Sequence, residues 1–208
     1  MAGLRERKKA ETRQRIADVA AHLFATQGFD AVAMTDVARA ADVSEQTVYN
    51  YFPAKQDLAL DRADAIRQRL HDLVVDRPRG TSPAVALQVV VFEDIARART
   101  DDLAEQRGQF FALCAGSPVV RRFGLEVRDG QVGALRDALA VTDPSLHPGL
   151  AHVHASALVA ILQFVGDAIG AAVLRDTRPA ADLEDTARVA IADLDAHFHQ
   201  LVHREAHP

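Results

Sequence analysis

The stretch MTDVARAADVSEQTVYNYFPAKQDL, residues 34–58, contains the pattern that decides the fold. Thr35 is predicted to cap a short first helix, because a threonine hydroxyl accepts a hydrogen bond from a free backbone N–H. Ser44 is predicted to cap a second helix over residues 45–51, and Pro53 ends that helix because proline has no N–H to donate. Two short helices joined by a tight turn indicate a helix-turn-helix, whose second helix enters a DNA major groove.

The second helix of this motif has one apolar and one polar side. Val48 and Phe52 are four residues apart, so we expect both to point inward. The residues left to point outward are Gln46, Thr47, Tyr49 and Asn50. Glutamine and asparagine pair with adenine, threonine contacts a thymine methyl group or a phosphate, and tyrosine donates to phosphate. The alternative reading is an ordinary helical hairpin inside a core.

The stretch from Ile16 to Leu58 resembles the DNA-binding domain of the TetR (tetracycline-repressor) family of transcriptional regulators. The match has no gaps, and the residues that carry it are Ala20, Leu23–Phe24, Gly28–Phe29, Thr35, Val37–Ala38, Ala41, Val43–Ser44, Thr47, Tyr49, Tyr51–Phe52 and Lys55–Leu58. Asp42 departs from the family, which usually has glycine there; the turn often requires a left-handed residue, and aspartate tolerates that conformation. The resemblance implies that Lys55 contacts a DNA phosphate.

We divide the chain into a flexible basic arm (1–8), a DNA-binding domain (9–53, with the motif at about 33–52), a connecting helix (54–75) and a ligand-binding and dimerisation domain (76–208). The boundary follows the turn-rich sequence DRPRGTSP at residues 76–83. The residues predicted to bind DNA are Arg13, Thr35, Ser44, Gln46, Thr47, Tyr49, Asn50, Tyr51 and Lys55.

The chain is acidic overall but basic at its start. The net charge is −5, yet residues 1–15 hold six basic and two acidic side chains. Such a segment is either a solvated tail or an arm that reaches a phosphate or the minor groove. A protein that reads DNA can be acidic overall when its positive charge is concentrated where it contacts phosphate.

The composition also limits which class of protein this chain can be. The 208 residues are 49% hydrophobic, enough for a substantial core. The single cysteine, Cys114, excludes an intrachain disulfide and fits a reducing compartment. The charged N-terminus does not resemble a secretory signal, and the longest apolar run, Ala155–Leu174, contains Gln163 and Asp167. We therefore expect a cytoplasmic protein, in a pool associated with the bacterial nucleoid, with no membrane partner.

Apolar spacing predicts an all-α protein of about nine helices, with no strand signal and no repeat. The expected helices are Lys9–Gln27, Thr35–Ala40, Glu45–Tyr51, Ala54–Val75, Pro83–Thr100, Asp101 or Asp102 to Ala115, Pro118–Val141, Leu150–Leu174 and Leu183–Arg204. Gly28 is expected to end the first helix, and Ser117 to cap the seventh with Pro118 at its first position.

The last two helices are more apolar than surface helices need to be, so a second copy of the chain could cover one face. The resemblance implies the same, because TetR-like repressors dimerise through a four-helix bundle of these helices. The predicted interface residues are Val153, Ala157, Ile161, Ala168, Ala172, Ile191, Leu194 and Phe198. A two-fold dimer predicts a palindromic operator, with recognition helices about 34 Å apart or a multiple of that distance. The alternative is a central helix in a monomer.

The aromatic residues of the body either form plain core or line a ligand cavity, and the resemblance favours a cavity. The candidate pocket residues are Phe92, Arg97, Phe110, Phe111, Cys114, Phe123, Gln163, Phe164 and Asp167. Gln163 and Asp167 are polar groups in an apolar helix and need partners, which a ligand or a partner subunit could supply. The apolar lining suggests a hydrophobic or amphipathic effector.

Neither a metal nor a catalytic site is supported. His199, His203 and His207 have the i, i+4 spacing of metal ligands, but a solvated helix end explains them as well. Phosphate-loop, nucleophile-elbow, HExxH and CxxC motifs are missing from the sequence. We therefore expect no metal, no cofactor and no enzyme activity.

The sequence predicts a ligand-responsive transcription regulator, most simply a repressor that leaves its operator when a small effector binds. One alternative is a helical ligand-binding or enzyme-like bundle that retains a helix-turn-helix head. The other is a constitutive DNA binder without an effector.

Overall fold

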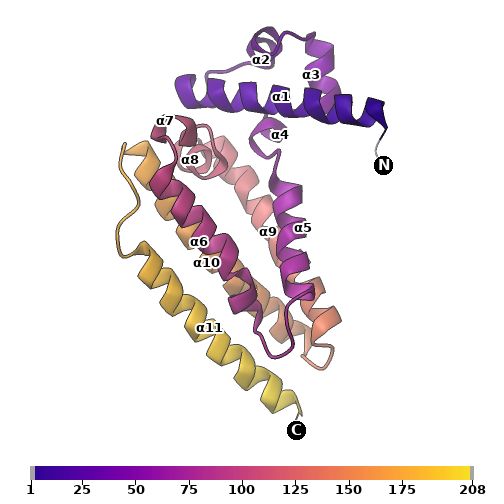
Figure 1. Ribbon diagram of the computed structural model, residues 1–208, viewed down its shortest axis with the longest axis vertical. Coiled ribbons are helices and arrows are strands. Elements are labelled where there is room, and N and C mark those ends of the chain that lie inside the picture. The colour runs from indigo at the N-terminus through magenta and orange to yellow at the C-terminus, as the bar shows by residue number, and fades with distance from the viewer. Residues whose placement is uncertain (1–2, 207–208) are drawn as a thin grey trace.

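The computed structural model describes the backbone of residues 3–206 and the side chains of residues 3–202. This part of the chain is entirely helical (Figure 1), which confirms the predicted class. The helices are α1 (Leu4–Gln27), α2 (Met34–Ala40), α3 (Glu45–Tyr51), α4 (Lys55–Ala59), α5 (Ala63–Val75), α6 (Pro83–Thr100), α7 (Leu103–Gln106), α8 (Phe110–Gly116), α9 (Pro118–Thr142), α10 (Pro148–Leu174) and α11 (Leu183–Ala206). The number exceeds the predicted nine because two expected helices are each divided in two.

Helices α1 to α4 form a head at one end of the molecule (Figure 1). Its core buries Ile16 and Phe24 of α1, Val37 of α2, and Val48 beside Phe52 at the end of α3. Gly28 ends α1 with a φ of 83°, a conformation that glycine adopts without a steric penalty. In Figure 1, α2 and α3 lie on the side of α1 that faces away from the body.

Two details of the head correct the sequence prediction. Thr35 lies inside α2, which Ala33 caps; the carboxylate of Asp36 accepts the Ala33 N–H over 3.0 Å and takes over the capping role. Helix α1 begins at Leu4, so residues 4–8, which we expected in a flexible arm, are helical. Residues 1–2 of that arm lie outside the described part of the chain. The charged run after Gly3 is rich in Arg, Lys and Glu, which favour helix.

The predicted connecting helix is also divided. Helix α4 ends at Ala59 and α5 begins at Ala63, with a turn closed by the Ala63 N–H and the Leu60 carbonyl over 2.8 Å. No proline or glycine marks the break, so residue propensities could not predict it. Its cause is tertiary: Leu58 packs into the core of the head, whereas Leu70 packs into the core of the body.

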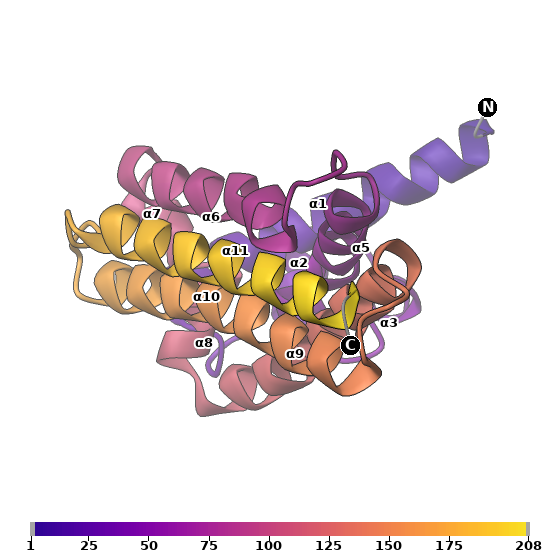
Figure 2. The same ribbon diagram turned by 90° about the horizontal axis from the view of Figure 1, so that it is seen from below.

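The body consists of α5 to α11, with α10 packed against α6, α8, α9 and α11. Figure 2 shows α6, α11 and α10 side by side. Helix α10 is long and apolar enough to cross a membrane by length and composition, but half of its most apolar window is buried among these neighbours. That burial is typical of the central helix of a folded core. Ser117 caps α9 with Pro118 at the first position, as predicted.

Candidate nucleic-acid interface

Helix α3 has the two faces that its sequence predicts. Val48 and Phe52 are fully buried, whereas Gln46, Tyr49 and Asn50 are exposed. Gln46 donates to the Asn50 side chain over 3.1 Å, so these two amides lie side by side on one exposed helical face. An exposed pair of amides beside a tyrosine can offer donors and acceptors to base edges and phosphates.

The start of α3 is fixed by its cap and by the turn before it. The Ser44 hydroxyl accepts the Thr47 N–H over 3.1 Å, which confirms the predicted cap. Thr47 is half-buried, and its hydroxyl lies 2.8 Å from that of Ser44. Asp42 has a φ of 52°, the left-handed conformation that the turn was expected to require. These contacts orient α3 before any DNA is bound.

The other predicted DNA-binding residues differ in how accessible they are. Thr35 is exposed near the start of α2, whereas Tyr51 is half-buried against the core of the head. The Lys55 ammonium lies 4.4 Å from the centre of the Phe29 ring and 3.4 Å from the Asp30 carbonyl oxygen. Partial burial lowers the pKa of Lys55, although the nearby Asp30 carboxylate opposes that shift. A phosphate contact by any of these residues stays a prediction.

The side chain of Arg13 makes its contacts with other residues of the same chain. Its guanidinium donates to the Tyr51 carbonyl over 2.9 Å, pairs with the Asp61 carboxylate, and lies 4.2 Å from the centre of the Phe52 ring. Asp61 had not been predicted as a functional residue, and the periodicity of the sequence gives no signal for this pair. The exposed basic residues of α1 are Arg5, Arg7, Lys8, Lys9 and Arg15, and a DNA contact by Arg13 stays a prediction.

Part of the predicted ligand pocket comes together where α8, α9 and α10 meet. The Arg128 guanidinium donates to Gln163 over 3.1 Å, and Gln163 donates to Asp167 over 2.6 Å, so both polar groups of α10 have partners within the chain. Burial, together with the charge of nearby Asp167, raises the pKa of the Cys114 thiol to about 11, while Arg121 opposes the shift. The rings of Phe110 and Phe111 are 6.0 Å apart beside this group.

Other members of the predicted pocket lie elsewhere. Phe92 of α6 packs under the Arg188 guanidinium, 4.8 Å from its ring centre, and Arg97 is exposed in a pair with Asp94. Phe164 is 45% exposed, and Phe123 is half-buried. Between α6, α10 and α11 the body leaves a void of only about 10 Å³, which is far too small for an effector.

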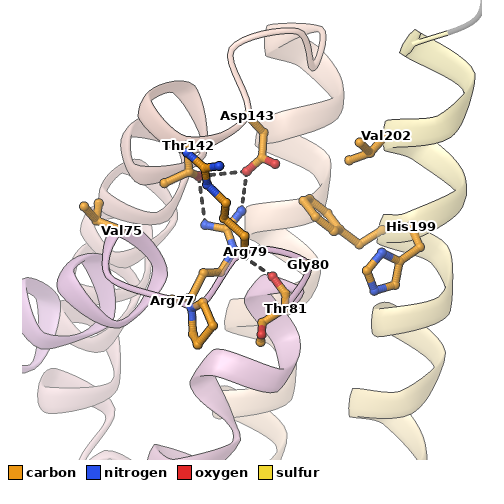
Figure 3. Close-up of a pocket in the computed structure, with 11 residues that line it drawn as sticks. Val75, Arg77, Arg79, Gly80, Thr81, Thr142, Asp143, His199 and Val202 are labelled. Carbon is orange, nitrogen blue, oxygen red and sulfur yellow. Dashed lines mark hydrogen bonds and ion pairs between the residues drawn. The ribbon is translucent and has the colours of Figure 1, made fainter.

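A larger cavity, of about 430 Å³, lies beside the ends of α5 and α9, and Figure 3 shows the residues that line it. It is lined by Val75, Arg77, Pro78, Arg79, Gly80, Thr81, Thr142, Asp143, Phe198, His199 and Val202. Arg77 braces one wall: it pairs with Asp143 and donates to the Thr81 carbonyl over 2.9 Å and to the Thr142 hydroxyl over 2.8 Å. Phe198 and Val75 give the cavity an apolar portion.

The predicted dimer residues divide into two groups. Ala172, Ile191 and Phe198 are buried in the chain's own core, so they offer no surface to a partner, which corrects that part of the prediction. Val153 is 63% exposed, and Ala157, Ile161, Ala168 and Leu194 are half-buried. Val153 and Phe164 share one face of α10, because eleven residues make about three helical turns.

The possible metal site at His199, His203 and His207 can be examined only in part, because the structure describes side chains up to residue 202. Among the side chains that the structure describes, no three His, Cys, Asp or Glu residues gather in a way that could hold a metal ion. His199 lies 3.4 Å from Asp195, one turn earlier on α11. The side chain of His203 and all of His207 lie outside the described part of the chain, so their contribution is untested.

Residues 16–61 match the family described as bacterial regulatory proteins, tetR family. The chain is 34% identical over 138 residues to the HTH-type transcriptional repressor KstR of Rhodococcus jostii, covering 64% of this chain and 61% of that protein. It is 30% identical over 101 residues to the HTH-type transcriptional regulator TcmR of Streptomyces glaucescens, covering 49% of this chain and 45% of that protein. The matches thus span about half to three fifths of these curated relatives.

The fold itself matches over nearly the whole chain. The crystal structure of AlkX from Dietzia sp., a TetR family repressor implicated in biodegradation of n-alkanes, superposes with a TM-score of 0.56 at 19% identity. That superposition covers 91% of this chain and 97% of AlkX. At this level of identity the similarity concerns the fold alone.

Proposed function

Because the chain belongs to the TetR family of bacterial regulatory proteins, we propose that it binds a DNA operator as a homodimer and represses transcription there. The observation that carries this proposal is the exposed polar face of α3, with Gln46, Tyr49 and Asn50 outside and Val48 and Phe52 buried. A short helix that is anchored by two buried residues and capped by Ser44 can enter a major groove without rearranging. Regulation of this kind is a cytoplasmic activity.

A gel-shift experiment with the purified protein and the DNA upstream of its own gene tests this function. Binding should weaken steeply with added salt, because phosphate contacts release counterions. Gln46→Ala, Tyr49→Ala and Asn50→Ala should each weaken the shift about tenfold, the loss expected for a good base or phosphate contact. Gln68→Ala, at an exposed glutamine of α5, is the matched control and should bind like the wild type. An unaltered shift in the triple variant of α3 would refute the assignment of the interface.

The proposed homodimer uses the outer face of α10. Val153 and Phe164 are exposed there, and Val189 is exposed on neighbouring α11. Exposed large apolar residues that share one helical face, as Val153 and Phe164 do on α10, favour an association surface there. Two copies related by a two-fold axis would present two α3 helices, so the proposed operator is an inverted repeat.

We also propose that a small hydrophobic or amphipathic effector releases the DNA by binding in the body. A ligand has two places to enter: the aromatic group around Phe111, where side chains must move, and the open cavity beside Arg77, which has a volume of about 430 Å³. Both lie against helices that lead towards the head. The effector acts only through a difference in affinity between the DNA-bound and free shapes.

A thermal-shift screen of small molecules, followed by a gel shift with each hit, tests the effector proposal. Val75→Trp should fill the open cavity and abolish the stabilisation by a ligand that binds there. Phe110→Ala should weaken the binding of a ligand that sits in the aromatic group. A protein that shifts DNA but is released by no compound would be the constitutive binder, and a compound that is chemically converted would favour the enzyme-like alternative.

A further inference from the structure

Arg13 joins three segments of the head through one guanidinium group. It donates to the carbonyl of Tyr51, the last residue of α3, over 2.9 Å, and it pairs with Asp61 in the turn between α4 and α5. The same group lies 4.2 Å from the centre of the buried Phe52 ring. A planar guanidinium can satisfy all three contacts at once, which a lysine ammonium cannot. The end of the recognition helix is thereby tied to α1 and to the connector.

The turn that holds Asp61 lies at the boundary between the head and the body. Leu58, on α4, belongs to the core of the head, and Leu70, on α5, belongs to the core of the body. Ile66, between them, is exposed. The short segment from Leu60 to Arg62 therefore joins the two cores and is the backbone connection at which the angle between the head and α5 is set, while Leu113 of α8 and Val120 of α9 also pack against the head.

We propose that Arg13 and Asp61 form a latch that sets the angle of the head, and with it the position of α3, for DNA binding. The proposal rests on the DNA-binding function proposed above and makes Arg13 a positioning residue that does not itself contact phosphate. The side chain of Asp61 is 15% exposed and that of Arg13 is 42% exposed, so the pair is partly screened from solvent. Opening the latch frees both the end of α3 and the turn between α4 and α5.

The latch and a direct phosphate contact by Arg13 predict opposite effects of Asp61. If Arg13 contacted phosphate, Asp61→Asn would remove a negative charge near the DNA and leave Arg13 freer, so affinity would rise or stay unchanged. If the pair is a latch, Asp61→Asn breaks it and affinity falls. By charge alone, removing an acid near DNA should strengthen binding, because DNA is a polyanion. A weaker complex in Asp61→Asn would therefore point to the latch.

The test measures the dissociation constant for a bound duplex over a range of salt concentrations, using wild type, Arg13→Gln, Asp61→Asn and the double variant. Each single variant should bind about fivefold more weakly, the size of effect expected for a well-formed, partly exposed ion pair. The double variant should be no weaker than Arg13→Gln, because that substitution already removes the ion pair with Asp61. The dependence of affinity on salt should keep the slope of the wild type.

The matched control is Asp64→Asn, which removes an exposed acid of α5 that pairs with Arg67 three residues along the same helix. It should not weaken DNA binding. Tighter or equal binding by Asp61→Asn, or a salt slope reduced by about one in Arg13→Gln, overturns the latch, since the second result is that of a lost phosphate contact.

Hydrogen exchange provides a readout that does not need DNA. The Ala63 N–H, which closes the turn onto Leu60, should exchange at least several-fold faster in Asp61→Asn, with unchanged exchange in α9 and α10. Unchanged exchange at Ala63 also overturns the latch. If the wild-type protein binds no DNA while exchange at Ala63 rises as expected, the DNA-binding function fails and the latch within the fold stands.

Discussion

The hydroxyl of Ser117 donates a hydrogen bond to the carboxylate of Asp30 over 2.9 Å, and this bond joins the body to the head. Ser117 is the cap of α9, and Asp30 lies in the loop between α1 and α2. Leu113 of α8 and Val120 of α9 are buried in the core of the head beside this bond. The head is therefore joined to the body by this contact as well as by the connector α4–α5, and α1 also packs against α7.

Asp30→Ala removes the cross-link without removing the cap of α9. The Ser117 hydroxyl is buried and loses its acceptor, so we expect the free energy of unfolding to fall by about 1 kcal/mol. Chemical denaturation checks this value. Asp129→Ala, at an exposed acid of α9, is the control and should unfold like the wild type. An Asp30→Ala protein as stable as that control would mean that the bond contributes nothing.

Gly170 lies where α10 comes close to the backbone of α8. A Cβ atom at this position would collide with the carbonyl oxygen of Phe111, which is backbone and cannot rotate away. We expect Gly170→Ala to lower the free energy of unfolding by about 1–3 kcal/mol. Gly133→Ala in α9 is the matched control: nothing lies within 4 Å of its Cβ position, so it should stabilise the helix by about 0.5–1 kcal/mol. Equal effects of the two substitutions in urea denaturation would contradict the packing described.

His154 makes the stability of the body depend on pH. Its ring packs 5.0 Å from that of Phe198, and neither ring nitrogen has a hydrogen-bond partner within the described residues. Burial lowers the pKa of His154 to about 4, assisted by His197 and Arg77, while Asp143 opposes the shift.

Because the pKa is lowered in the folded state, the unfolded chain takes up this proton first as the pH falls below about 6.5. The stabilisation is complete above that pH and is lost progressively down to about 4. Between pH 7 and pH 5 the wild type should lose about 2 kcal/mol more stability than His154→Phe, measured by denaturation at both values. Parallel losses in the two proteins would show that His154 takes up a proton in the folded state.

The outer face of α10 should control the oligomeric state. Phe164→Glu places a charge in the proposed interface, and burying an unpaired charge is costly, so the dimer should dissociate at micromolar concentration. Light scattering checks the mass against the 22.6 kDa of one chain. Val141→Glu, at an exposed valine of α9, is the control and should remain a dimer. A wild-type protein that stays a monomer at high concentration would refute the interface.

The head could be predicted from the sequence in considerable detail because its signals are local. The Ser44 cap, the inward positions of Val48 and Phe52, and the left-handed turn at Asp42 each depend on a few neighbouring residues. The spacing of apolar residues also located the long helices of the body. Capping was less predictable where two acceptors compete, as with Thr35 and Asp36 at the start of α2.

What could not be predicted depends on contacts between distant residues. The break between α4 and α5 has no sequence signal, and the Arg13–Asp61 pair joins residues 48 positions apart. Helical periodicity placed Ile191 and Phe198 on the apolar face of the last helix, but it could not tell whether residues of their own chain or of a partner cover that face. For the same reason the aromatic residues of the body could not be divided into packed core and cavity lining.

Selection of bound sequences from a random pool of duplex DNA tests the central claim most directly, because it needs neither the operator nor the effector in advance. The account predicts an enriched inverted repeat whose half-sites change when Gln46 and Asn50 are replaced by alanine, and which Gln68→Ala leaves unchanged. A pool that shows no enrichment with the wild-type protein, or the same repeat with the α3 variant, would contradict the claim that α3 reads DNA.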